Sequence, residues 1–156
     1  MKPRAFALIV IAVAAAAGAA GAAEPSPGEA LYWQHCARCH GSDLRGEPDW
    51  QTPAANGRIK APPHDESGHT WMHAESELLA LIRSGRGGAA APGSVSDMPN
   101  FGGRLSDDEI RAVLAFIAGH WPPGHRAYQM MLEPDFDPAR LPAGDWQLPR
   151  MCLPQK

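Results

Sequence analysis

The chain has 156 residues and a formal net charge of −3 at pH 7, and this length suffices for one small domain with appendages. Its 17 acidic residues outnumber its 14 lysines and arginines, which excludes the basic footprint that nucleic-acid binding requires. The three cysteines are an odd number, and two of them stand three residues apart, so the sequence does not predict a framework of structural disulfides.

The first 23 residues have the composition of an export signal. Lys2 and Arg4 precede an uncharged, alanine-rich run over 5–23 that ends in small residues suited to a signal peptidase. We therefore predict a signal peptide over residues 1–23 and an exported protein. An uncleaved membrane anchor is the alternative, because the 19 residues of the run approach the ~20 that span a bilayer. Without residues 1–23 the net charge is about −5, which would suit docking onto a basic protein surface or simply maintain solubility.

Capping signals and apolar periodicity predict three helices. The first begins after Ser26, the expected N-cap, and continues through a cysteine pair to Gly41. The second covers about 74–84 and ends at Gly85. The third begins at a capping box, Ser106-Asp107-Asp108-Glu109, and ends before two prolines at 122 and 123.

Two stretches lack periodicity. Residues 42–70 are rich in Gly, Pro, Asn and Asp and are expected to form a long irregular loop. Such a loop is unusual in a small domain unless it packs against something other than protein. The tail over 124–156 contains five prolines and is predicted to be extended chain, which could wrap the domain or dock on a partner.

The motif Cys36-Ala37-Arg38-Cys39-His40 has the spacing of a c-type haem attachment site. Two thiols one helical turn apart can bond the two vinyl groups on one porphyrin edge, and the next imidazole then faces the iron. Half of a zinc site and a thioredoxin-type redox pair are the alternatives. Zinc would require a second Cys/His pair, and the redox pair normally stands beside a βαβ pattern, so one covalent haem is the favoured prediction.

Met98 is the predicted sixth iron ligand. It follows a Gly-rich segment over 85–93 and is held by a proline just before the third helix. A thioether stabilises ferrous iron and suits electron transfer, whereas a lone methionine is more often a core residue that fills a gap. Met72, His64, His69 and His73 are rival ligands; the three histidines could instead bind copper or zinc, or be polar loop and cap residues.

The whole pattern resembles the class I cytochrome c family in its bacterial, single-haem form. The resemblance is carried by Gly28-Glu29-Ala30-Leu31-Tyr32 before the Cys36–His40 motif, by Met98-Pro99-Asn100-Phe101-Gly102, and by the apolar helix after Leu105. It implies an all-α fold with three main helices and long loops wrapped around one haem c. It also implies thioethers from Cys36 and Cys39, His40 as proximal ligand and Met98 as distal ligand. In such proteins a proline carbonyl, here Pro62 or Pro63, often accepts the proximal N–H.

This resemblance predicts a cytochrome domain over 26–121 and a Pro-rich C-terminal extension over 122–156, in a periplasmic protein. The expected function is to carry single electrons between redox partner proteins, without catalysis of its own and with membrane contact only if residues 1–23 stay attached. A haem enzyme or sensor, with a labile sixth ligand and acting on peroxide or a small gas, is the alternative. Cys152 is not needed by the haem, and the sequence assigns it no role.

Overall fold

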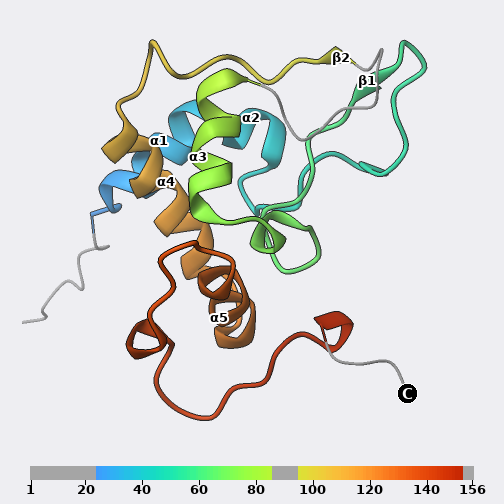
Figure 1. The fold of residues 1–156 in the computed structure, drawn as a ribbon. Coiled ribbons are helices and arrows are strands. Elements are labelled where there is room, and N and C mark those ends of the chain that lie inside the picture. The colour runs from blue at the N-terminus through green and yellow to red at the C-terminus, as the bar shows by residue number, and fades with distance from the viewer. Residues whose placement is uncertain (1–23, 86–94, 153–156) are drawn as a thin grey trace, which may run out of the picture.

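The computed structural model describes residues 24–85 and 95–152. The predicted signal peptide and most of the Gly-rich segment lie outside these residues. The described chain is dominated by helices, in agreement with the predicted all-α class, but it holds five α-helices where three were expected (Figure 1). The elements in chain order are α1 (Pro27–His35), α2 (Ala37–His40), β1 (Arg58–Ile59), η1 (Thr70–Met72), α3 (Glu75–Ser84), β2 (Val95–Ser96), α4 (Asp107–Gly119), α5 (Pro123–Met131), η2 (Pro138–Arg140) and η3 (Arg150–Cys152).

The helix boundaries follow their local capping signals closely. Ser26 Oγ accepts a hydrogen bond from the amide of Glu29 at the start of α1. Ser106 and Glu109 bond each other reciprocally at the start of α4. Gly85 adopts the left-handed conformation, with φ of 71°, that ends α3. These caps pair backbone N–H and C=O groups that a helix end leaves without partners. The helix ends could therefore be predicted from the sequence.

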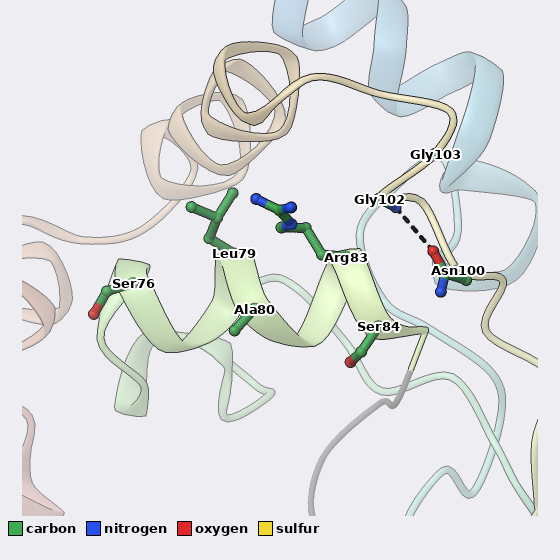
Figure 2. A pocket seen from close by; sticks show the side chains of 8 residues that line it. All are labelled: Ser76, Leu79, Ala80, Arg83, Ser84, Asn100, Gly102 and Gly103. Carbon is green, nitrogen blue, oxygen red and sulfur yellow. Dashed lines mark hydrogen bonds between the residues drawn. The ribbon is translucent and has the colours of Figure 1, made fainter.

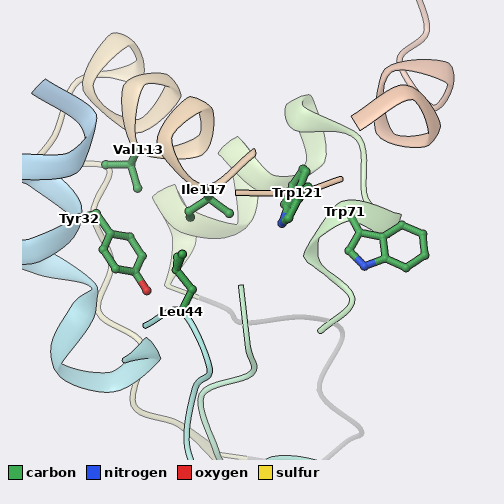
Figure 3. Close-up of a cluster of buried hydrophobic side chains, with 6 residues drawn as sticks. All are labelled: Tyr32, Leu44, Trp71, Val113, Ile117 and Trp121. Atoms are coloured by element: carbon green, nitrogen blue, oxygen red, sulfur yellow. The ribbon is translucent and has the colours of Figure 1, made fainter. Parts of the chain in front are cut away.

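The first and last predicted helices cross at a glycine. A Cβ added at Gly28 of α1 would lie 2.0 Å from the carbonyl oxygen of Ala112 in α4, so only glycine permits this backbone approach. Below the crossing, Tyr32, Val113 and Ile117 are buried in the main core cluster, which also contains Leu44, Trp71 and Trp121 (Figure 3). The core therefore joins both ends of the predicted cytochrome domain to its long loop.

A second, smaller cluster fixes α3. Leu78 and Leu79 of α3 are buried against Ile110 and Leu114 of α4. The long loop over 42–69 is irregular as predicted, except for β1, which pairs in parallel with β2 through Arg58 with Val95 and Ile59 with Ser96. Within 24–85 and 95–152, no helix is both long and apolar enough to cross a bilayer.

The prediction of an extended tail is wrong for residues 123–131, which form α5. A proline at the first helical position lacks only an N–H that the helix does not use, so Pro123 begins α5 instead of excluding it. The helix packs on η1, where His125 and Tyr128 contact Trp71 edge to face with ring centroids 4.4 and 5.6 Å away.

The chain after α5 folds back onto the domain. A carboxylate oxygen of Glu133 accepts a hydrogen bond from the amide of Glu75 at the start of α3. Gly124 lies so close to the returning chain that a Cβ there would be 1.8 Å from the carbonyl oxygen of Gln147. Cys152 is half-buried and packs against the main core cluster. After α5, the extension therefore contacts the domain at the start of α3 and at the main core cluster, and its returning segment is packed on α5 at Gly124.

We expect Gly124→Ala to loosen this returning segment, because the added methyl overlaps the Gln147 carbonyl. Limited proteolysis should cut 141–152 faster in the variant than in the wild type. Gly103→Ala is the matched control, since no atom lies within 4 Å of a Cβ placed there. Equal cleavage rates in all three proteins would contradict the expected anchoring.

Candidate functional site

The three residues of the Cys-x-x-Cys-His motif lie on one short turn. Cys36, with φ of −114°, interrupts the helix between α1 and α2. The amides of Cys39 and His40 both donate to the Cys36 carbonyl, at 3.1 and 3.0 Å. Gly41, with φ of 81°, ends the turn, and its carbonyl accepts a 2.8 Å hydrogen bond from the Tyr32 hydroxyl. All three cysteines of the chain are free thiols, so both members of the pair are available for thioether bonds.

The surroundings of His40 favour the neutral form of its imidazole. Its ring is buried, with 8% of the residue exposed, and its Nδ1 lies 2.9 Å from the carbonyl oxygen of Pro62. A carbonyl only accepts, so Nδ1 carries the hydrogen and Nε2 keeps its lone pair. Burial lowers the pKa of His40, against smaller opposing effects of the Pro62 bond and the Glu47 charge. Of the two candidate prolines, Pro62 is thus the one whose carbonyl contacts the His40 imidazole.

His64 lies against His40. The two imidazole rings stack with centroids 3.9 Å apart and planes 19° from parallel. Two imidazoles that bind one iron from opposite faces would have ring centroids about 6 Å apart. Each metal–nitrogen bond is about 2 Å long, and each ring centroid lies about 1 Å beyond its nitrogen. The geometry therefore places His64 beside His40, the predicted proximal ligand, which disfavours its rival assignment as the sixth ligand.

The other two loop histidines lie beside each other, with ring centroids 5.5 Å apart and planes at 64°. The His69 ring stacks on Trp50 with centroids 5.2 Å apart, and His73 pairs with Glu77 at 3.1 Å. Nδ1 of His69 is a buried nitrogen without a hydrogen-bond partner. In the described part of the chain, no group of three or more His, Cys, Asp or Glu side chains is arranged to hold a metal ion. The three loop histidines thus do not form the copper or zinc site that was one alternative.

Met98 lies on the segment that follows β2. Its side chain is half-buried, and its amide donates to Ser96 Oγ at 3.3 Å. Its backbone carbonyl packs against Gly85, where a Cβ would lie 2.8 Å away. This close approach explains why the residue that ends α3, Gly85, must be a glycine where the Met98 segment passes it.

An ion-pair chain links the Met98 segment to the long loop. Arg58 of β1 donates two hydrogen bonds to Glu47, at 2.7 and 2.9 Å, and contacts Asp97 at 3.3 Å. Glu47 also accepts from the amide of Ala61 at 2.7 Å. Sequence reasoning missed this arrangement because its members are far apart in the chain and none has a characteristic spacing.

The Glu47 carboxylate predicts a pH dependence of stability. Its hydrogen bonds with Arg58 and then Ala61 lower the pKa of Glu47 to about 2, from an ordinary value of 4.5. Because the folded state holds this proton less tightly than the unfolded state, the stabilisation is present above pH 4.5 and is lost as pH falls toward 2. Urea unfolding at pH 6 and pH 3 should show a smaller acid-induced loss in Glu47→Gln than in the wild type. An equal loss would show that the pair does not contribute.

A shallow surface hollow lies between α3 and the chain after Met98 (Figure 2). Its lining includes Ser76 and Arg83 from α3, with Asn100 and Gly102 on the opposite side. The Asn100 side chain accepts a 3.0 Å hydrogen bond from the Gly102 amide, which shapes the turn before α4. None of the predicted site residues lines this hollow, so it is distinct from the Cys36–His40 turn.

The residues present fit a covalently bound haem. Two free thiols stand on one turn, and a buried imidazole has one nitrogen satisfied and the other available. No curated protein and no solved structure matches the chain. A family model described as cytochrome c oxidase, cbb3-type, subunit III matches residues 23–117, which is more than half of the chain. The chain therefore belongs to this family of c-type cytochromes, whose cofactor is haem c.

Proposed function

We propose that this protein is a single-haem electron carrier in which Cys36 and Cys39 form the thioethers and His40 and Met98 are the axial ligands. The observation that carries the proposal is the buried His40 ring, whose Nδ1 lies 2.9 Å from Pro62 O on the turn that bears both free thiols. A hydrogen bond of this kind fixes the tautomer and orientation of a ligating imidazole.

Each residue has a defined part in this proposal. Bound haem would supply an iron centre that gains and loses one electron. His40 would present the Nε2 lone pair, while Pro62 holds the opposite side of its ring. Met98 would supply a thioether, which favours the ferrous state and so raises the reduction potential. With both axial positions occupied by protein, no position remains for a substrate.

The organisation of the chain follows from the same proposal. Residues 26–121 are the cytochrome domain, and 122–156 are an extension that packs on it through α5 and the chain after it. Residues 1–23 are an export signal, or an anchor if uncleaved, and the domain works in the periplasm between a donor and an acceptor protein. The acidic balance of the chain suits docking onto basic partner surfaces.

The absorption spectrum of the exported, haem-loaded protein tests this function. The ferric form should be low-spin and show the weak near-infrared band of a methionine bonded to iron, and the ferrous form should not bind carbon monoxide. A high-spin ferric spectrum together with rapid carbon monoxide binding would overturn the carrier and favour a haem enzyme or gas sensor. The double variant Cys36→Ser, Cys39→Ser is the control for attachment and should retain no covalent haem by mass spectrometry.

A further inference from the structure

The proximal side of the site contains a second imidazole that the electron-carrier proposal does not use. His64 stacks face to face on His40, with centroids 3.9 Å apart. The Pro62 carbonyl meets the edge of the His40 ring at Nδ1, whereas His64 covers its face. One hydrogen bond leaves the ring free to swing about the line from Nδ1 to the oxygen. A flat group against its face removes that remaining freedom.

His64 is itself held by directional contacts. Thr70 Oγ1 donates to the Pro63 carbonyl at 3.3 Å, and His64 Nδ1 lies 2.9 Å from the same hydroxyl oxygen. A hydroxyl has one hydrogen, so Thr70 accepts from His64 Nδ1–H. This chain of two hydrogen bonds sets the rotation of the His64 ring, which an apolar side chain of similar volume could not do.

The backbone of His64 is fixed from both sides as well. Its amide donates to the Leu44 carbonyl at 2.6 Å, and its carbonyl accepts from Trp121 Nε1 at 2.7 Å. Leu44 and Trp121 both belong to the buried core cluster (Figure 3). The His64 backbone is therefore tied to the buried core, and the stack places the His64 ring directly against the ring of His40.

We propose that His64 is a positioning residue that sets the plane of the His40 imidazole relative to the haem. This inference rests on the proposed role of His40 as the proximal iron ligand. In low-spin ferric haem, the plane of an axial imidazole determines how unpaired spin is distributed over the porphyrin. The proton resonances of the haem ring methyls report that distribution directly, so orientation can be measured separately from stability.

The test compares three variants of the haem-loaded protein by ferric proton NMR. His64→Phe keeps a flat ring but loses the N–H, His64→Leu keeps volume without a flat face, and Thr70→Val keeps the imidazole but removes its acceptor. We expect the pattern of ring-methyl shifts to change most in His64→Leu. It should change less, and by similar amounts, in His64→Phe and Thr70→Val, because both keep a flat ring on His40 but lose the hydrogen bond that sets its rotation. The near-infrared methionine band should persist in all three.

Other outcomes would overturn the inference. Unchanged methyl shifts in His64→Leu, with only a lower unfolding temperature, would show that His64 is a packing residue. Equal changes in His64→Leu and His64→Phe would show that the flat face is irrelevant. If His64→Leu does not assemble, unchanged shifts in Thr70→Val are sufficient to reject the inference. Failure of the electron-carrier proposal would appear separately, as a wild-type protein without the low-spin spectrum and methionine band.

Discussion

Met98→Ala is expected to lose the near-infrared methionine band while its haem stays covalently attached. Replacing the thioether by water or another weak-field group removes the preference for ferrous iron, so the reduction potential should fall. We expect a fall on the order of 0.1 V or more, within the ~0.8 V range over which axial ligands tune haem proteins. Potentiometric titration and the ferric spectrum measure the two effects independently.

Two other methionines provide the controls for this experiment. Met131, at the end of α5, is exposed and should leave both the band and the potential unchanged when replaced by alanine. Met72 lies in η1 and packs against the main core cluster, so Met72→Ala should lower stability but keep the band. Loss of the band in Met72→Ala, with the band kept in Met98→Ala, would show that the sixth ligand is misassigned.

Gly28→Ala is expected to destabilise the fold strongly, because it acts where two core helices cross. The new Cβ would stand 2.0 Å from the Ala112 carbonyl oxygen, and backbone cannot yield as a flexible side chain can. Helices α1 and α4 would have to separate, which should lower the free energy of unfolding by about 3 kcal/mol. Urea unfolding followed by circular dichroism measures the loss.

Gly119→Ala is the matched control, at the other end of the same helix pair. No atom lies within 4 Å of a Cβ placed at Gly119, and this residue is helical. Alanine there should be neutral or stabilise the protein by about 0.5–1 kcal/mol, because it restricts the unfolded chain and favours the helix. If both variants unfold at the same urea concentration, the glycine crossing is not what fixes α1 against α4.

Local chemistry made part of this fold predictable. Ser26, Ser106 and Gly85 act on backbone groups within a few residues, so their sequence patterns place helix ends directly. The haem attachment motif is equally local, because one helical turn brings both thiols and the imidazole together. The family match over 23–117 confirms the type of cytochrome that these patterns indicated.

Features that depend on distant parts of the chain could not be predicted in the same way. The pairing of β1 with β2 and the contact of Arg58 with Asp97 are set by tertiary packing. The proline pair at 122 and 123 predicts the end of one helix, but Pro123 equally suits the first position of the next. For His64, the sequence showed a histidine near the haem motif but not that its ring lies on the proximal ligand.

The hydrogen bond from Trp121 Nε1 to the His64 carbonyl has a consequence for biogenesis. Translation produces Cys36 and Cys39 long before Trp121, so the two thiols leave the ribosome ahead of the residue that closes the loop at His64. If the proposed function holds, both thiols would therefore be open to haem attachment while the surrounding loop is not yet closed. Closure of the loop by Trp121 would then come late in folding, and in the folded domain Cys39 is still exposed while Cys36 is half-buried.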